Sequence, residues 1–393
     1  MRKRRLSVLA KTLITFASVI ALIIVLAASY VVYIFASYYR VGDQDLSITS
    51  NTPSEFSAVS VDTVYSITTY NIGFGAYSQD YTFFMDTGYD KDGNKTAGHW
   101  GKALSEEDVI FNTKGAIKTI SDINPDFAMF QEVDTNSTRS YHVNQYEMIT
   151  SAFPVLDAVF CLNFHSAYLP YPLYDMHGSV EAGLTTLSRY KIQSAQRKEY
   201  TISSSFSKLF DLDRCFEVNV INVSNGKKLY VVNSHMSAYD EGGVIRAQQI
   251  KELNDFLSAC QEEGSYVIVG GDFNHDLLTY NPDYIYNKDT NRVFGMTKKA
   301  PDWLSFFFNK DGSSSLIDGY KVIASDNSPT CRNNDIEWIP DESFVCAVDG
   351  YIISSNIVVD SIENIKTTNG KKGIDGFAYS DHEPVLLKFK LAA

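Results

Sequence analysis

The chain has 393 residues, of which 45% are hydrophobic and 13% aromatic, and this composition excludes an intrinsically disordered protein. Its charge is uneven: residues 1–40 carry six basic residues and no acidic one, whereas the remainder holds 28 Lys and Arg against 47 Asp and Glu, a net charge of −19. Such a body excludes a global attraction for nucleic acid or an anionic membrane, although it leaves a local basic cleft open.

The first predicted element is a helix near the N-terminus, because Leu13 to Ala36 is an uncharged, largely apolar run of 24 residues. At about 1.5 Å per residue this run spans roughly 36 Å, which is enough to cross a bilayer. Basic residues precede it, so the positive-inside rule predicts a single-pass signal anchor in the cell membrane, with a cytoplasmic N-terminus and an extracellular main domain. A cleaved signal peptide is the competing interpretation, but the run is long for one and Ala27-Ala28-Ser29 is a weak cleavage site.

These features divide the chain into four predicted segments. They are a basic cytoplasmic N-terminus (1–12), a transmembrane helix (13–36), a polar juxtamembrane linker (37–61) and one folded domain (62–393). No Pro- or Gly-rich hinge interrupts residues 62–391, which favours a single domain over two.

Within that domain, strand patterns and helix patterns alternate along the chain. Apolar or β-rich runs predict strands at 65–70, 126–130, 229–232 and 266–269. Helical spacing predicts a helix that starts at Ser105, which forms a capping box with Asp108, and stops at Asn124-Pro125. The alternation indicates an α/β protein with layered sheets and helices.

A second helix is predicted from Val244 to Cys260, between the last two of these strands. Its apolar face is expected to carry Ala247, Ile250, Leu253 and Leu257.

Two stretches exceed a minimal α/β core. Residues 135–180 are rich in aromatics and His, and residues 280–345 carry aromatics such as Trp303, Phe307 and Phe308 among polar residues. Either stretch can form walls of a cleft or close the core beneath long loops, and the sequence leaves both interpretations open.

Five cysteines show no metal-ligand spacing, since no CxxC pair occurs. Cys331 and Cys346, 15 residues apart, are able to form a disulfide in an oxidising compartment. Free, mostly buried thiols are the alternative.

The most informative feature is a set of five short polar runs, four of which directly follow an apolar stretch. In chain order they are TYNIG (69–73), QEVD (131–134), NSHMS (233–237), GGDFN (270–274) and SDHEP (380–384). Polar groups at strand ends can converge on one cleft at the edge of a sheet. Acidic oxygens suit a hard divalent cation, and His and Asn suit phosphoryl oxygens, so the composition favours metal-assisted phosphate chemistry.

Together with VDGYIIS (348–354), this ordered set resembles the endonuclease/exonuclease/phosphatase superfamily over residues 64–391. The superfamily includes pancreatic-type deoxyribonuclease, abasic-site endonucleases, inositol-polyphosphate phosphatases and bacterial sphingomyelinases. The resemblance implies a four-layered α/β sandwich with two packed mixed β-sheets flanked by helices, here with an N-terminal transmembrane helix added. The chain looks like a membrane-anchored, bacterial-type member.

The resemblance also implies a metal site. Glu132 corresponds to the principal ligand of the family, and Asn71 and Asp381 are expected beside it. The implied cofactor is Mg²⁺, with Mn²⁺ as a substitute, because Mg²⁺ prefers charged oxygen donors and keeps several waters.

Five further residues match catalytic positions of the family: Asp272, Asn274, His235, His382 and Asp349. By resemblance, Asp272 orients or deprotonates the attacking water, and Asn274 bonds the phosphoryl oxygens. Asp349 orients His382, which contacts the phosphate or transfers a proton. His235 matches a histidine found in deoxyribonuclease-like and sphingomyelinase-like members, where abasic-site enzymes tend to carry Tyr, so it argues against abasic-site repair.

Two arginines, Arg214 in DLDRC and Arg332 in PTCRN, are weaker candidates for binding the substrate phosphate. Exposed arginines are common, so the alternative is that either one simply lies on the surface.

The predicted function is therefore that of a membrane-anchored, Mg²⁺-dependent phosphoric ester hydrolase in which activated water attacks in line. Tethering and the net charge of −19 favour a lipid headgroup or a small extracellular phosphoester as substrate. An anchored nuclease is the main alternative and requires a basic cleft, to which Arg214, Arg332 and Lys298–Lys299 are candidates to contribute. A catalytically inactive binding module is the third hypothesis, disfavoured because none of the family's groups is missing. The sequence identifies no protein partner.

Overall fold

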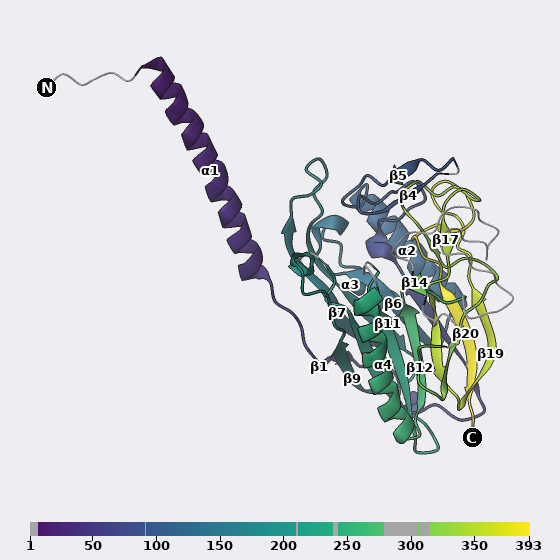
Figure 1. The fold of residues 1–393 in the computed structure, drawn as a ribbon. Coiled ribbons are helices and arrows are strands. Elements are labelled where there is room, and N and C mark those ends of the chain that lie inside the picture. Colours follow the sequence, from purple (N-terminus) through teal and green to yellow (C-terminus); the bar gives the residue numbers. More distant parts are fainter. Residues whose placement is uncertain (1–6, 91, 210, 239–242, 279–304, 307–313) are drawn as a thin grey trace.

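Two seven-stranded mixed sheets packed face to face form the body of the protein (Figure 1). The structure is a computed structural model that describes residues 7–90, 92–209, 211–238, 243–278, 305–306 and 314–393. The strand order is β1-β9-β10-β11-β12-β18-β15 in the first sheet and β19-β20-β3-β6-β8-β7-β2 in the second.

The strands of the first sheet are β1 (Gln44–Asp45), β9 (Ile192–Glu199), β10 (Cys215–Asn222), β11 (Lys228–His235), β12 (Tyr266–Asp272), β15 (Tyr320–Ile323) and β18 (Asp349–Ser354). Those of the second are β2 (Ile48–Thr49), β3 (Val64–Asn71), β6 (Phe127–Asp134), β7 (Asp157–Leu169), β8 (Gly178–Ser188), β19 (Ile357–Asn364) and β20 (Val385–Leu391).

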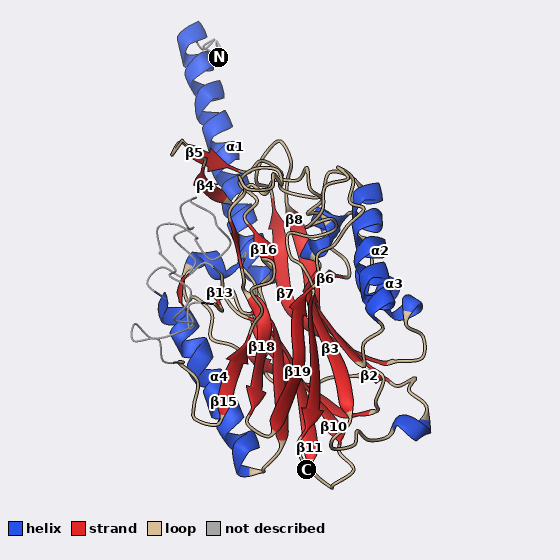
Figure 2. Ribbon diagram, turned by 90° about the vertical axis from the view of Figure 1, so that its right-hand side faces the viewer, coloured by secondary structure: helices blue, strands red, loops and turns tan. Residues whose placement is uncertain are grey.

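Helices cover the outer faces of both sheets, as Figure 2 shows. Helix α4 (Val244–Glu262) packs on the first sheet through Ile250, Leu253 and Leu257. Helices α2 (Glu106–Ile123) and α3 (Gln145–Ala152) pack on the second. The predicted four-layered α/β sandwich is therefore confirmed.

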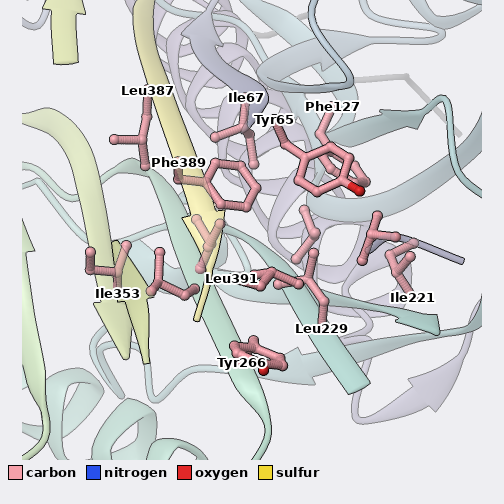
Figure 3. Packing of buried hydrophobic residues seen from close by; sticks show 14 of the residues in the cluster. Tyr65, Ile67, Phe127, Ile221, Leu229, Tyr266, Ile353, Leu387, Phe389 and Leu391 are labelled. Carbon is pink, nitrogen blue, oxygen red and sulfur yellow. The ribbon is translucent and has the colours of Figure 1, made fainter. Parts of the chain in front are cut away.

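The core between the sheets is apolar. Figure 3 shows Ile67 and Phe389 of the second sheet facing Leu229 and Ile353 of the first, and all four side chains are buried. Each such side chain contributes about 1.5–3 kcal/mol by leaving water, so this layer is the main source of stability.

One parallel strand pair lies inside each sheet and determines where the polar motifs end. Strands β3 and β6 are parallel and pair Asn71 with Gln131, while β11 and β12 are parallel and pair His235 with Asp272. Parallel strands end at the same edge, so four of the five polar motifs leave the sheets at one end of the sandwich. Strand β18 runs antiparallel to β12 and places Asp349 opposite Asp272 at that same end.

The predicted helices form, with one correction. The Oγ of Ser105 accepts from the Asp108 N–H, and α2 ends at Asn124, which adopts a left-handed conformation before Pro125. In α4, however, the prediction that Ala247 lies on the buried face is wrong, because Ala247 is exposed while Arg246 and Gln249 are buried. Gln249 bonds the backbone N–H of Ser237 and the carbonyl of Thr201. Hydrogen bonding, and not hydrophobicity, therefore determines which residues are buried in the first turns of α4.

Helix α1 (Val8–Ser37) is longer than the predicted span 13–36 and stands clear of the sandwich for most of its length (Figure 1). Ser7 caps it by accepting from the Ala10 N–H. By length and composition it is able to cross a membrane, a test that a signal sequence also passes. Ile34, close to its C-terminal end, is its buried residue.

Residues 37–61, expected to link this helix to the domain, also take part in the sandwich. β1 pairs with β9 and β2 pairs with β7, so the segment supplies an edge strand to each sheet.

The remaining elements are short. They are the strand pairs β4 (Thr87–Tyr89) with β5 (Lys95–Ala97), β13 (His275–Asp276) with β14 (Ser305–Phe306) and β16 (Cys331–Arg332) with β17 (Val345–Cys346), and the 3₁₀ helices η1 (Ser54–Phe56), η2 (Gly73–Gly75), η3 (Thr138–Ser140) and η4 (Phe206–Leu209).

All five cysteines are buried free thiols, the second of the two alternatives that the sequence left open. Cys331 and Cys346 nevertheless face each other across β16 and β17. The Sγ atoms of Cys161 and Cys215 lie 3.6 Å apart.

Candidate active site

The strand ends open into a cleft of about 610 Å³. Eight of the ten predicted side chains line it, namely Glu132, Arg214, His235, Asp272, Asn274, Arg332, Asp381 and His382. The other two are hydrogen bonded to lining residues: Asn71 to Asp272, and Asp349 to His382. The structure therefore brings together all ten residues that the sequence singled out.

Asp272 lies at the centre of this arrangement and is almost fully buried. Its Oδ2 accepts a hydrogen bond from Asn71 Nδ2 at 3.0 Å and lies 3.5 Å from His235 Nε2 and 3.6 Å from His382 Nε2. Its Oδ1 accepts from the backbone N–H of Asn274 at 2.9 Å. A carboxylate held in this way between two imidazoles is fixed in position and has an imidazole nitrogen on each side.

The two histidines differ in protonation. Burial acts to lower the pKa of His382, but the carboxylates of Asp349 and Asp272 hold it well above the ordinary value. For His235, burial and the nearby Arg214 guanidinium hold the pKa well below that value. Burial also raises the pKa of Asp272, and the charge of Asp349 adds to this. The two imidazoles beside Asp272 therefore have pKa values shifted in opposite directions by their surroundings.

The GGDFN motif has a steric reason for its second glycine. Gly271 has φ +151°, and a Cβ there would overlap the carbonyl oxygen of Ser234 on β11. The glycine thus lets β12 approach β11 closely, next to the residue that carries the central carboxylate.

Glu132 reaches the cleft through a local irregularity in β6. The pairing of β6 with β8 shifts register between Phe130 and Val133, and Glu132 has φ +54°. A bulge of this kind re-aims a side chain, and here it brings Glu132 Oε1 within 3.3 Å of Asn71 Nδ2. Burial raises the pKa of Glu132, Arg139 opposes this, and Asp381 adds to it.

Asp381 is held from two sides. Its Oδ2 accepts from Asn334 Nδ2 at 2.8 Å, and its Oδ1 accepts from Ser380 Oγ at 3.3 Å. The Ser380 hydroxyl is also 2.7 Å from the carbonyl oxygen of Asn71, which ties the SDHEP motif to the end of β3.

The residues present fit a hard divalent cation. Glu132 and Asp381 both line the cleft, and the charge of Asp381 raises the pKa of Glu132, so a cation beside them would relieve a repulsion between carboxylates. A second group, Asp272, Asp349 and His382, also has the donor spacing of a metal site, with ligand atoms all within 4.8 Å of one another. Carboxylate-rich donor sets of this kind are those that Mg²⁺ prefers.

The two weaker arginine candidates are buried in the cleft wall and not exposed on the surface. Among the residues that the structure describes, Nε and Nη1 of both Arg214 and Arg332 have no hydrogen-bond partner. Buried N–H groups of a guanidinium that lack a partner are costly, and an anion in the cleft would satisfy them.

Three contacts were not predicted from the sequence. Arg139 lines the cleft, binds Asp134 through two hydrogen bonds and lies 3.9 Å from Glu132 Oε2. Asn334 holds Asp381, and Cys331 Sγ lies 3.6 Å from His382 Nε2. Arg139 lies in the short 3₁₀ helix η3 and Asn334 lies in a loop, and neither stretch carries a sequence pattern that singles its residue out.

Of the two aromatic stretches, the first contributes to the wall of the cleft and the second closes part of the core. From the first, Phe164, Tyr171 and His177 line the cleft. From the second, Trp338 packs against Phe377, with ring centroids 4.8 Å apart, and closes a small core. The predictions for Trp303, Phe307, Phe308 and Lys298–Lys299 fall outside the described residues.

The chain was compared with protein families, curated protein sequences and solved structures. Residues 69–309 match the family described as Endonuclease/Exonuclease/phosphatase. No curated protein sequence matches the chain.

Solved structures resemble this chain at low sequence identity. ANGEL2, described as a 2',3'-cyclic phosphatase, is 14% identical with a TM-score of 0.50, over 84% of this chain and 96% of its own. TDP2 of D. rerio, solved with a single-strand DNA product, is 13% identical with a TM-score of 0.49, over 84% of this chain and 100% of its own. An endonuclease/exonuclease/phosphatase protein of Beutenbergia cavernae is 13% identical with a TM-score of 0.47, over 84% and 72%.

Proposed function

The chain belongs to the endonuclease/exonuclease/phosphatase family of phosphoesterases, and we propose that it is a membrane-anchored, Mg²⁺-dependent hydrolase of a lipid headgroup or small extracellular phosphoester. The observation that carries the chemistry is the position of Asp272 between two imidazoles, with its Oδ2 3.5 Å from His235 Nε2 and 3.6 Å from His382 Nε2. The anchor is helix α1, whose N-terminal side carries the basic residues that favour a cytoplasmic location.

In the proposed reaction, water attacks phosphorus in line with the departing ester oxygen. Asp272 orients the water and accepts its proton, while the new oxygen–phosphorus bond forms and the ester oxygen–phosphorus bond breaks. His382, kept protonated by Asp349, donates a proton to the departing oxygen. The products are an alcohol and a phosphate one ester bond shorter, and no covalent enzyme intermediate forms.

Phosphoryl oxygens would be held by three groups around Asp272. Asn274 uses one amide hydrogen on the Met236 carbonyl at 2.9 Å, which leaves the other for substrate. Arg214 offers unpaired N–H groups in the described part of the cleft, and neutral His235 lies beside it. Removing one such positioned group typically costs about 10²–10⁴ in rate.

Glu132 and Asp381 would hold the metal ion, and Asn71 would keep Glu132 and Asp272 together through its Nδ2. When bound, Mg²⁺ would offset negative charge on the phosphoryl and departing oxygens. We assign the ion to this side of the cleft because Glu132 and Asp381 both line it with carboxylate oxygens, whereas Asp349 Oδ2 is already bonded to His382 Nδ1 at 2.8 Å.

A nuclease is the second candidate, favoured by the buried arginines Arg214 and Arg332 in the cleft wall, which could bind the phosphates of a nucleic acid. It is opposed by the net charge of −19 outside residues 1–40.

The test is hydrolysis by the full-length protein of para-nitrophenyl phosphate, bis-para-nitrophenyl phosphate, phospholipid vesicles and supercoiled plasmid. We expect hydrolysis of a phosphoester that Mg²⁺ supports, EDTA abolishes and His382→Ala reduces by about 10²–10⁴. His142→Ala is the matched control, since the His142 side chain lies outside the cleft lining. Metal-dependent plasmid nicking that requires His382 would establish the nuclease, and activity unchanged in His382→Ala would refute the site.

A further inference from the structure

The C-terminal end of α1 is attached to the end of β7. Ile34, which is 2% exposed, packs against Ala167 and Leu209. Two backbone groups of Tyr168 bond the helix: its carbonyl accepts from Tyr30 Oη at 2.9 Å, and its N–H donates to Tyr33 Oη at 3.2 Å. The end of β7 therefore lies beside the last two turns of the apolar helix, at the depth where that helix would leave a bilayer.

The loop that follows β7, residues 170–177, presents apolar side chains to solvent. Leu173 is 76% exposed and Tyr174 is 64% exposed. The loop's acidic residue, Asp175, is turned inward, where its Oδ2 accepts from the backbone N–H groups of Gly101 and Lys102 at 2.8 and 3.2 Å. The exposed face of this apolar loop is thus uncharged, which is unusual for a surface in contact with water.

The same loop forms part of the rim of the catalytic cleft. Tyr171 lines the cleft and packs against Phe84, with ring centroids 5.6 Å apart, and the exposed Met85 also lines it. The floor of the cleft carries the carboxylates, histidines and arginines. A cleft that is charged at its floor and apolar at its rim fits a phosphoester with an apolar tail.

The direction of α1 agrees with this arrangement. In Figures 1 and 2 the helix extends beyond the end of the sandwich that carries β4 and β5, opposite to the C-terminus. That end holds the cleft, since residues 83–86, which lead into β4, line it. A bilayer crossed by α1 would therefore lie above the mouth of the cleft.

We propose that the apolar loop 170–177 inserts into the interface of the bilayer beside the C-terminal turns of α1, so that the cleft takes a phosphoester whose alcohol part is embedded in that membrane. This inference rests on the proposed function for the hydrolysis itself. It narrows the substrate to a membrane lipid and assigns the loop as the surface that contacts it.

The first test locates the loop without measuring activity. Full-length Leu173→Trp is reconstituted in phosphatidylcholine vesicles with and without brominated acyl chains, and Val155→Trp is the matched control. Val155 is 61% exposed and lies just before the other end of β7. We expect the fluorescence added by the new indole in Leu173→Trp to be quenched at least about twofold more than that added in Val155→Trp. Equal quenching in the two variants overturns the insertion of the loop.

The second test measures hydrolysis by full-length Leu173→Glu and Val155→Glu. The vesicles contain phosphatidylcholine, phosphatidylethanolamine, phosphatidylglycerol and sphingomyelin, and the soluble substrates are the para-nitrophenyl esters. We expect Leu173→Glu to lower lipid hydrolysis by about tenfold or more, because a carboxylate resists entry into the interface. Hydrolysis of the soluble ester should be unchanged, and Val155→Glu should match the wild type on both.

The two proposals fail in different ways. If wild-type protein hydrolyses soluble esters but no vesicle lipid, the membrane substrate is wrong and the phosphoesterase stands. If Leu173→Glu keeps full lipid hydrolysis, the assignment of the loop as the membrane-contacting surface is wrong, while the phosphoesterase and its lipid substrate stand. If neither lipid nor soluble ester is hydrolysed with Mg²⁺, the proposed function and the lipid substrate both fail, while the quenching result still decides where the loop lies.

Discussion

At the scale of single residues, the contact that most affects the proposed chemistry is between Asp349 Oδ2 and His382 Nδ1, 2.8 Å apart in a buried setting. A carboxylate beside an imidazole fixes its tautomer and stabilises its charged form. The role of His382 as proton donor therefore depends on a residue that does not itself line the cleft.

We expect Asp349→Asn to lower kcat for a soluble phosphoester by about 10²–10⁴, because His382 loses the charge that keeps it protonated. The melting temperature should remain close to that of the wild type, since Asn occupies nearly the same volume. Steady-state kinetics and thermal denaturation check this, with Asp360→Asn on the surface strand β19 as control. A kcat within a factor of about three of the wild type would contradict the pairing.

A second residue-scale feature lies away from the cleft. Glu217 on β10 is fully buried, and its Oε1 accepts from Asn219 Nδ2 at 2.7 Å. Burial raises its pKa to about 7. Because the folded state binds this proton more tightly than the unfolded state does, Glu217 lowers stability progressively as pH rises from about 4.5 to about 7, and the loss is complete above that range.

Glu217→Gln should remove this penalty while keeping an oxygen for Asn219. Relative to wild type, the variant should gain about 3 kcal/mol in free energy of unfolding between about pH 4 and about pH 8. Urea denaturation at both pH values measures the difference, and the surface substitution Glu363→Gln serves as control. A variant whose stability relative to wild type is the same at both pH values would show that Glu217 does not titrate as described.

At the scale of elements, the two sheets are joined by polar contacts directly beneath the cleft. Gln131 Nε2 on β6 donates to Asn233 Oδ1 on β11 at 2.7 Å, and Asn233 Nδ2 donates to the Phe130 carbonyl at 3.1 Å. Gln131 precedes Glu132, and Asn233 lies two residues before His235. The link therefore sets the separation between groups that come from different sheets.

Asn233→Ala should destabilise the fold by about 2–3 kcal/mol, because Gln131 and the Phe130 carbonyl would remain buried without partners. The control is Asn51→Ala, at an exposed position. Chemical denaturation measures both variants, and a change below about 0.5 kcal/mol in Asn233→Ala would mean that the link does not hold the sheets.

Local sequence predicted some features of the elements correctly and others wrongly. Helix α2 starts and stops at the predicted residues because capping by Ser105 and the Asn124-Pro125 stop act within one turn of the chain. The face of α4 was partly wrong at Ala247, because the burial of Gln249 depends on Thr201 and Ser237, which approach from distant sequence.

At the scale of the whole molecule, the hydrophobic core is formed by residues of the sandwich and scarcely involves helix α1. The three largest clusters, between the sheets and beneath the helices, draw on residues from Val59 onward, with Leu46 and Ile48 packed against one of them. Helix α1 contributes Ile34 as its buried side chain. Its contacts with the body are therefore few for an element of its length.

A piece that begins at Arg40 should fold, and in the same detergent its free energy of unfolding should lie within about 2–3 kcal/mol of the full chain's. Starting there keeps the ion pair between Arg40 and Glu199 at 3.3 Å. Circular dichroism during thermal denaturation compares the two, and a truncated piece without cooperative unfolding would show that α1 is needed for the fold.

The sequence alone indicated an α/β protein and the apolar N-terminal helix, because periodicity and capping are local properties of the chain. The four-layered sandwich and most of the ten candidate residues came from the resemblance of its ordered motifs to a family. Only the tertiary structure decided which of these residues touch. Asn71 and Asp272 are 201 positions apart, yet their side chains lie 3.0 Å from each other. Arg139 and Asn334 join the site without any local signal. Contacts such as that between Asn71 and Asp272 form only when the two sheets pack on each other. The placement of the end of β7 beside α1 likewise depends on tertiary packing, which involves the whole chain at once.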